Sequence, residues 1–299
     1  MEIKKKYNLI EFINLIRVYQ WLKNILIFLP LFTVNIFPDT NLILKYFFGF
    51  FALSLCASSV YVFNDILDFK NDKSHPIKCQ RPIASEQFSI YQGLIFGFVI
   101  LIIGLILSYN INLKFFLHIL SYIVITNLYS VFFKKLFLLD CIFLSFFYTF
   151  RIIIGCSVME INISHWLFVI SFFWFLSLAI IKRYSELLIF KTNNKKKLLG
   201  RNYYVKDIDK VKLFGLISGY ISLIFLSFYI YSNNAKLYFT QPNIIWFLVL
   251  ILFIWINYMW FNAAKNKIFN DPVIYALKNK TSLFLGFIFI LFSMLAKWI

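Results

Sequence analysis

The feature that most constrains this chain is a series of apolar runs, each long enough to cross a lipid bilayer. Of its 299 residues, 61% are hydrophobic and 14% are charged, and the mean hydropathy is +0.78. Soluble domains do not have this balance, and an apolar helix needs about 20 residues to cross the hydrocarbon core. The sequence therefore predicts an all-α, polytopic membrane protein. Nine spans are expected, over residues 22–38, 42–63, 89–109, 113–133, 136–157, 164–181, 212–232, 243–262 and 281–298.

The segments outside the spans differ in charge. Residues 1–21 combine lysines with apolar positions at helical spacing, which predicts an interfacial amphipathic helix. Most of the 30 Lys and Arg residues lie there and in 64–88, 134–135, 182–211 and 263–280. Because cytoplasmic segments are enriched in Lys and Arg, we expect the N-terminus and the loops 64–88 and 182–211 in the cytoplasm, and the C-terminus outside an inner or plasma membrane. This bias is the first explanation of the net charge of +17, and the excess can serve anionic lipid headgroups or phosphorylated substrates, so no nucleic-acid partner is expected.

Cysteine and histidine do not indicate a metal centre. The four cysteines are scattered without a CxxC pair, and the three histidines lack the spacing of metal ligands. Carboxylates are the better candidates. Three of the 13 acidic residues, Asp65, Asp68 and Asp72, lie within eight positions after the second span, beside Asn64.

The spacing of these aspartates (i, i+3, i+7) places them on one face of a helix. Hard oxygen ligands suit Mg²⁺, which proteins hold with one or two carboxylates plus substrate phosphates. Lys78 and Arg81 follow, and cations beside a metal site suit a diphosphate leaving group. The alternatives are a solvated helix end for the aspartates and positive-inside charge for the two bases.

Arg151 lies well inside the apolar segment 143–158. An ionisable side chain at such a depth normally faces a cavity or a partner. We expect Arg151 to bind a phosphate, and Asp140, eleven residues earlier on the same helical face, to lie near the cytoplasmic mouth. A structural ion pair with another helix is the alternative.

Several motifs, in their order along the chain, resemble those of the UbiA superfamily of intramembrane prenyltransferases. Together they look like one branch of it, the decaprenyl-phosphate phosphoribosyltransferases. The motifs are Arg17-x-x-Gln20-Trp21-x-Lys23-Asn24, Asn64-Asp65-x-x-Asp68-x-x-x-Asp72, His75-Pro76-x-Lys78-x-x-Arg81-Pro82-Ile83, Leu139-Asp140 with Arg151 and Gly155, and Lys182-Arg183-Tyr184-x-Glu186.

The resemblance implies one domain over 1–299, a bundle of about nine transmembrane helices around a cytoplasm-facing cavity, and Mg²⁺ held by Asp65, Asp68 and Asp72. Enzymes of this superfamily that use a prenyl diphosphate have a second acidic motif after the sixth span. Here Lys182, Arg183 and Glu186 supply two bases and one acid. More cations suit a donor with an additional phosphate, such as phosphoribosyl pyrophosphate. Anchoring of the sixth span is the alternative.

The expected site therefore has two sets of residues. Catalysis is assigned to the three aspartates and Arg151. Contact with lipid headgroups is an equally good account of Lys23, and an interhelical hydrogen bond is the better account of Asn127 or Tyr129 taken alone. Substrate binding is assigned to Lys23, Asn24, Asn64, Lys78, Arg81, Asn127, Tyr129, Asp140, Lys182, Arg183 and Glu186.

The expected activity is a Mg²⁺-dependent transfer of 5-phosphoribose from phosphoribosyl pyrophosphate to a polyprenyl phosphate lipid, feeding glycan or cell-wall assembly. One alternative is prenyl transfer from a prenyl diphosphate to an aromatic acceptor. Another is a transporter or flippase, which would carry its charges near the bilayer midplane. The chain length of the lipid and the oligomeric state stay open.

Overall fold

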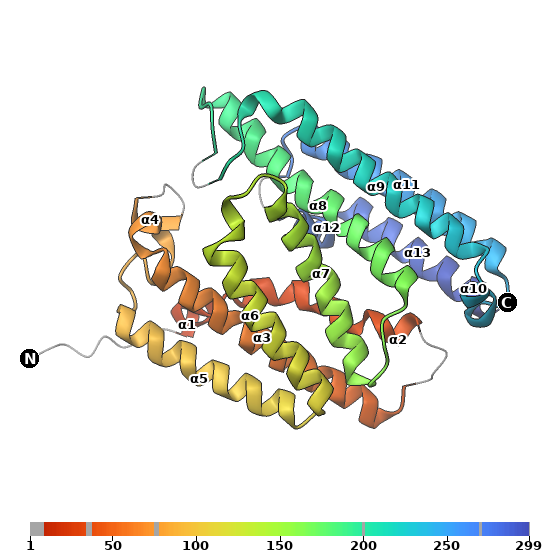
Figure 1. Cartoon of the computed structure of the whole chain (residues 1–299), viewed down its shortest axis with the longest axis horizontal. Coiled ribbons are helices and arrows are strands. Elements are labelled where there is room, and N and C mark those ends of the chain that lie inside the picture. Colours follow the sequence, from red (N-terminus) through yellow and green to blue (C-terminus); the bar gives the residue numbers. More distant parts are fainter. Residues whose placement is uncertain (1–8, 34–37, 75–77, 199–200, 269–270, 299) are drawn as a thin grey trace, which may run out of the picture. The chain divides into compact units, whose positions relative to one another are not determined.

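The computed structural model describes residues 9–33, 38–74, 78–198, 201–268 and 271–298 (Figure 1). These residues form helices and turns without a β-strand, so the all-α prediction is confirmed. The α-helices are α1 (Leu9–Leu15), α2 (Leu29–Thr33), α3 (Thr40–Leu67), α4 (Phe69–Lys73), α5 (Ile90–Tyr109), α6 (Leu113–Val131), α7 (Leu139–Val158), α8 (His165–Thr192), α9 (Ile208–Ile230), α10 (Asn233–Tyr238), α11 (Ile245–Ala264), α12 (Pro272–Lys278) and α13 (Lys280–Trp298). The 3₁₀ helices are η1 (Val18–Phe28), η2 (Lys78–Gln80), η3 (Phe133–Lys135), η4 (Val205–Asp207) and η5 (Pro242–Ile244).

Eight of the described helices are long and apolar enough to cross a membrane, and a ninth crossing results if the bent pair formed by α1 and the η1–α2 segment is one span. The two parts of that pair meet at an angle of 54°. This agrees with the nine predicted spans. Residues 34–37 of the first predicted span and residues 1–8 of the predicted interfacial helix lie outside the described residues.

The chain divides into two compact units. Unit 1 comprises Met1–Pro30, Phe37–Ser130 and Arg151–Ile161, and unit 2 comprises Leu31–Ile36, Val131–Phe150 and Asn162–Ile299. The boundary falls within α7, whose residues 139–150 belong to unit 2 and whose residues 151–158 belong to unit 1. The prediction of one domain over 1–299 stays a prediction.

In unit 1, α3 packs along α5 (Figure 1). The two helices approach closely at Gly104, where a Cβ atom would lie 2.6 Å from Cys56 Sγ. Small residues at helix contacts are typical of membrane bundles, since they let backbones approach. The η1 segment also packs on α3, through hydrogen bonds from Trp21 to Ser58 and from Asn24 to Ser54, both of 2.9 Å.

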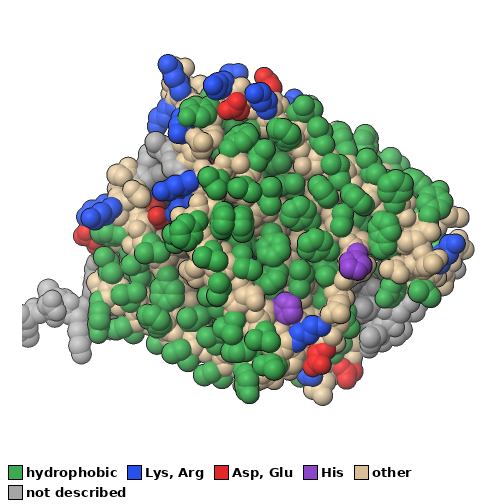
Figure 2. All heavy atoms as spheres, viewed as in Figure 1, with side chains coloured by type: hydrophobic (Ala, Val, Ile, Leu, Met, Phe, Trp, Pro, Cys, Tyr) green, Lys and Arg blue, Asp and Glu red, His purple; other side chains and the backbone are tan. Residues whose placement is uncertain are grey.

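In unit 2, α8 packs against α9, and α11 packs against both α9 and α13 (Figure 1). Trp260 of α11 fits against Gly215 of α9 and donates a hydrogen bond of 3.0 Å to Ser177 of α8. Large apolar side chains point outward, including Phe284 and Phe287 of α13. Figure 2 shows hydrophobic side chains over most of the visible face. Such a surface suits contact with lipid.

Two predicted boundaries are wrong. The predicted loop 64–88 begins within a helix, because α3 continues through Leu67 and carries Asn64 and Asp65 on its last turn. Asp68 then stands between α3 and α4, its N–H bonded to the Asn64 carbonyl, so the three aspartates do not share one continuous helical face.

The predicted loop 182–211 is likewise helical at its start, since α8 runs to Thr192. The apolar pattern resumes after the charged residues, with Leu187, Leu188 and Ile189, and this extends the helix well past the predicted end at residue 181.

Candidate active site

Two buried carboxylates of unit 1 share one arginine. Nη1 of Arg81 donates to Oδ1 of Asp65 at 2.9 Å and to Oδ2 of Asp72 at 2.5 Å. The side chains of Asp65 and Asp72 are 4% and 3% exposed, whereas that of Arg81 is 28% exposed. Asp65 lies on the last turn of α3 and Asp72 lies on α4, so the helix break at Asp68 brings the two carboxylates together around the same cation.

Two further cations reach this pair. Arg17 binds Oδ1 of Asp65 and lies over the Tyr61 ring, 5.3 Å from its centroid. Lys78 Nζ lies 3.9 Å from Oδ1 of Asp72. Lys78 and Arg81 were predicted site residues, whereas Arg17 was not. The signal for Arg17 in the sequence is its place at the start of the motif Arg17-x-x-Gln20-Trp21-x-Lys23-Asn24.

The residues of this cluster are chemically suited to Mg²⁺, although they do not form a closed cage. Among the described residues, no three His, Cys, Asp or Glu side chains are grouped closely enough to hold a metal together. The carboxylate oxygens of Asp65 and Asp72 nevertheless surround one position, which Nη1 of Arg81 occupies. Mg²⁺ commonly binds one or two carboxylates and takes its other ligands from water and phosphates. Asp68 and Asn64 are half-buried beside the pair.

Arg151 lies in a second polar group of unit 1. Its side chain is buried, and it donates to Oδ1 of Asn24 at 2.8 Å and to the Tyr122 hydroxyl at 2.9 Å. Asn24 in turn donates to Ser54 at 2.9 Å. Four segments (η1, α3, α6 and α7) therefore fix the guanidinium.

Three other predicted residues of unit 1 are half-buried: Lys23, Asn127 and Tyr129. The Asn127 amide donates to the Ile123 carbonyl of its own helix at 2.8 Å. This bond uses one of the two amide protons and leaves the side-chain oxygen as an acceptor.

In unit 2, Asp140 is fully buried and organises two arginines. Its Oδ2 accepts from Nε of Arg183 at 2.5 Å and from Nη1 of Arg201 at 2.7 Å, and its Oδ1 accepts from the Tyr203 hydroxyl. Arg183 is 1% exposed, and its Nη1 also donates to both carboxylate oxygens of Glu186, at 2.7 and 2.6 Å. The ion pair with another helix, which was the alternative for Asp140, is present in the structure.

Arg201 and Tyr203 were expected in a solvated cytoplasmic loop from which they could reach the site, but they were not among the assigned site residues. No helical or strand spacing connects them with Asp140, more than sixty residues earlier in the chain. Burial raises the pKa of the Tyr203 hydroxyl, and the neighbouring Cys141 and Asp140 raise it further. The hydroxyl therefore stays protonated at neutral pH and acts as a donor to Asp140.

Lys182 has a different carboxylate partner. Its Nζ lies 3.5 Å from Oδ2 of Asp271, which is buried at the start of α12. The Tyr148 hydroxyl donates to both oxygens of Asp271, at 3.0 and 3.2 Å, and the backbone N–H of Val273 donates to Oδ1 at 3.1 Å. Asp271 is thus held from two sides and fixes one end of Lys182. Asp271 was not among the predicted site residues.

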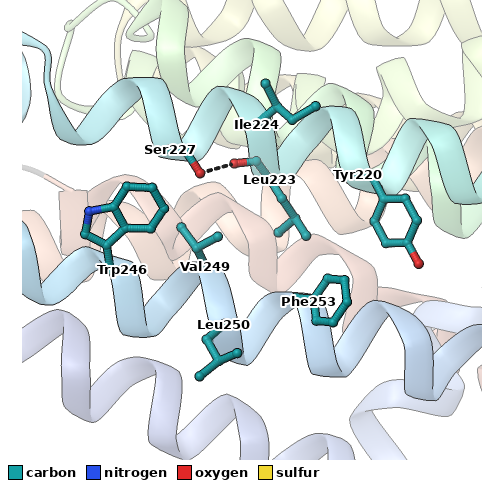
Figure 3. A pocket seen from close by; sticks show the side chains of 8 residues that line it. All are labelled: Tyr220, Leu223, Ile224, Ser227, Trp246, Val249, Leu250 and Phe253. Atoms are coloured by element: carbon teal, nitrogen blue, oxygen red, sulfur yellow. Dashed lines mark hydrogen bonds between the residues drawn. The ribbon is translucent and has the colours of Figure 1, made fainter.

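A groove of about 440 Å³ lies between α9 and α11 (Figure 3). Its lining is apolar and aromatic, with Tyr220, Trp246 and Phe253 prominent. The hydroxyl of Ser227 donates to the Leu223 carbonyl of its own helix at 3.0 Å. Because no charged side chain lines this groove, it is not a candidate for phosphate binding.

Three curated proteins are similar to this chain. The protein y4nM of Sinorhizobium fredii, described as uncharacterized, is 32% identical over 95% of this chain, and the chain spans 55% of its length. The nodulation protein NoeC of Azorhizobium caulinodans is 27% identical over 92% of each chain. The decaprenyl-phosphate phosphoribosyltransferase of Mycolicibacterium smegmatis is 28% identical over 58% of this chain and 56% of its own.

Solved structures share the fold. A UbiA homologue from Archaeoglobus fulgidus bound to GPP and Mg²⁺ has a TM-score of 0.69 at 17% identity, covering 97% of this chain and all of that one. A digeranylgeranylglyceryl phosphate synthase has a TM-score of 0.63 at 20% identity, covering 97% of this chain and 98% of that one. The sequence profile of the UbiA prenyltransferase family matches residues 26–187, more than half of the sequence. By this match and by its fold, the chain belongs to the UbiA prenyltransferase family, a family of multi-pass membrane transferases.

Proposed function

We propose that this protein transfers 5-phosphoribose from phosphoribosyl pyrophosphate to a polyprenyl phosphate, with release of diphosphate. The observation that carries the proposal is the presence of two arginines in the unit 2 cluster. Where prenyl-diphosphate enzymes of the superfamily have a second acidic motif, this chain sets Arg183 and Arg201 around Asp140. The similarity to decaprenyl-phosphate phosphoribosyltransferases over 179 residues supports the same donor.

In the proposed reaction, an oxygen of the lipid phosphate forms a bond to C1 of the ribose while the bond from C1 to the diphosphate oxygen breaks. The electron pair of that bond leaves with the diphosphate. A phosphate is already ionised near neutral pH, so no general base is required. Asp65, Asp68 and Asp72 would hold Mg²⁺, which neutralises charge on the diphosphate when bound.

In unit 1, the accessible cations have a direct role in this proposal. Lys78 is 45% exposed and Arg81 is 28% exposed, so both can reach diphosphate oxygens that the metal does not take. Asn64 lies beside them on α3. Arg151, held by Asn24, binds a phosphate oxygen, and Lys23, Asn127 and Tyr129 complete the polar lining for lipid phosphate and sugar.

In unit 2, the residues divide by exposure. Lys182 and Arg201 are 30% and 26% exposed, so they can bind a phosphate group. Arg183 is 1% exposed and Asp140 is fully enclosed. These two act mainly as positioning residues, since they hold Arg201 in place, and Glu186 completes their charge balance.

The proposed orientation follows from the distribution of Lys and Arg. The N-terminus and both clusters face the cytoplasm, where phosphoribosyl pyrophosphate is soluble, and the C-terminus lies outside. The expected cavity opens to the same side. The lipid-linked product would feed glycan or cell-wall assembly.

The test offers two radiolabelled donors in parallel to the purified protein in proteoliposomes that contain polyprenyl phosphate and an aromatic acceptor. One donor is phosphoribosyl pyrophosphate and the other is geranyl diphosphate. We expect label to enter the lipid from the first donor only, and to disappear when EDTA removes Mg²⁺. Mass spectrometry of the product should show the lipid phosphate extended by one phosphoribosyl group.

Variants link the result to the proposed site. Asp65→Asn and Asp72→Asn should abolish transfer, whereas Asp39→Asn, the same change in an exposed aspartate at the start of α3, should not. Label from geranyl diphosphate alone would support prenyl transfer and refute the proposal. Movement of lipid across the bilayer without labelling would point to a transporter.

A further inference from the structure

Arg17 has an unusual backbone conformation. Its φ and ψ are 53° and 50°, in the left-handed region, and it stands at the 54° bend between α1 and η1. Residues with a side chain seldom adopt positive φ, and such a conformation persists only where the surroundings impose it. The η1 segment that follows runs for 11 residues, although 3₁₀ helices rarely exceed three or four. Strain is therefore concentrated where Arg17 enters the first membrane segment.

Besides the local backbone bonds of Arg17 to Asn14 and Gln20, contacts from α3 hold this conformation. The Ser58 hydroxyl donates to the Ile16 carbonyl at 2.7 Å, which holds the backbone just before Arg17. The Arg17 guanidinium binds Asp65 and lies over Tyr61, and its side chain is 14% exposed. The bend thus delivers one cation to one carboxylate.

That carboxylate oxygen has two cationic partners. Oδ1 of Asp65 accepts from Arg17 and also from Arg81, while Arg81 bridges to Asp72. An oxygen that serves two guanidinium groups has little acceptor capacity left for a divalent cation. The positive charge beside it would also repel such a cation. A cation can therefore use Oδ1 only after at least one arginine moves.

Of the two arginines, Arg17 is the better candidate to move. Arg81 would keep a bond to Asp72 if it released Asp65, so its position is fixed by two carboxylates. Arg17 pairs with Asp65 across a strained bend, so its release would also let the backbone leave the left-handed region. Charge and backbone strain both favour displacement of Arg17.

We propose that Arg17 is the resident counter-charge of Asp65 and that a divalent cation displaces it. The inference rests on the proposed function, because it takes Asp65 as a ligand of Mg²⁺. Arg17 is a positioning residue in this scheme: it keeps Asp65 neutralised and oriented before the cation arrives. Cation binding is then coupled to the α1–η1 bend.

The test measures Mn²⁺ binding to the purified protein in nanodiscs by electron paramagnetic resonance, without donor or acceptor. Arg17→Met should bind Mn²⁺ about tenfold more tightly than the natural protein, equivalent to about 1.4 kcal/mol. Lys70→Met is the matched control, because Lys70 is exposed on α4 and its loss changes the net charge equally. Arg17→Gly removes the charge and also accepts positive φ, so it separates charge from strain.

Thermal unfolding gives a second readout. In EDTA, Arg17→Met should melt below the natural protein because Asp65 loses a partner, and saturating Mn²⁺ should narrow this gap. Arg17→Gly should show the same gain in Mn²⁺ affinity with a smaller loss in EDTA. That variant keeps the test decisive if Arg17→Met does not fold.

Three outcomes would overturn the inference. Weaker or unchanged Mn²⁺ binding by both Arg17 variants would show that Arg17 does not compete with the cation. An equal gain in Mn²⁺ affinity for Lys70→Met would show that only the net charge of the protein matters. Absence of Mn²⁺ binding by the natural protein and by both Arg17 variants would overturn the metal role in the proposed function as well, and this distinguishes the two failures.

Discussion

Replacement of Asp140 by Asn should destabilise the protein more than any surface change of the same kind. Asp140 has no exposed surface, and it accepts from Arg183, Arg201 and Tyr203. An amide in its place keeps the shape but removes the negative charge and turns one acceptor oxygen into a donor. Arg183, at 1% exposure, then loses its shortest charged partner.

The magnitude follows from burial and from what remains. Removal of one partner of a buried ion pair costs about 3–5 kcal/mol. Because Arg183 keeps its ion pair with Glu186, we expect the lower end, about 3 kcal/mol. A change of 1 kcal/mol shifts the melting temperature of a domain of 150–250 residues by about 2–4 °C, so a loss of about 6–12 °C is expected.

The assay is thermal unfolding in detergent, followed by intrinsic fluorescence. Asp209→Asn, an exposed aspartate of α9, is the control and should change the melting temperature by less than about 2 °C. Asp140→Leu combined with Arg183→Met removes both charges and should recover much of the loss, since an apolar pair replaces a buried ion pair at little cost. Additive losses in the double variant, or an unchanged melting temperature for Asp140→Asn, would refute the reasoning.

Three further outcomes are expected. Lys182→Met and Asp271→Asn should each raise the KM for the phosphoribosyl donor about five- to tenfold with little change in kcat. The double variant should have the same KM as either single variant, because the two side chains form one pair. Steady-state kinetics in which the two increases in KM multiply would contradict this. Gly155→Ala should lower the melting temperature, since the new methyl group would collide with an η1 carbonyl, whereas Gly286→Ala, with no atom within 4 Å of the new methyl group, should not. The raised pKa of Tyr203 contributes stability that is complete below about pH 10 and is lost as the pH rises towards the folded-state pKa. The melting temperature of the natural protein should therefore fall more steeply above pH 10 than that of Tyr203→Phe. Equal slopes for the two proteins would contradict the role of the Tyr203 hydroxyl.

Much of the helical architecture could be predicted because bilayer crossing leaves a strong local signal. An apolar run such as residues 89–109 contains its own evidence, and the structure places α5 over Ile90–Tyr109. The predicted helix ends were less accurate where charged residues interrupt the apolar run. Lys182, Arg183 and Glu186 suggested a helix end, yet each has a charged partner, so α8 carries them and continues.

The partners of the charged residues could not be predicted from spacing. Helical periodicity shows which side chains share a face, but it does not show which distant residue meets them. Arg17 and Asp65 lie 48 positions apart, and Tyr203 and Asp140 lie 63 apart. Asp271 gave no signal, because a single acid before a proline also fits an ordinary helix cap.

The 3₁₀ geometry of η1 affects how many residues the first membrane crossing requires. A 3₁₀ helix rises about 2.0 Å per residue and an α-helix about 1.5 Å. The 11 residues of η1 therefore extend about 22 Å, a distance for which an α-helix needs about 15 residues. Each deletion in this segment would shorten the crossing by about 2 Å, which makes its match to bilayer thickness more sensitive to length than that of the other spans.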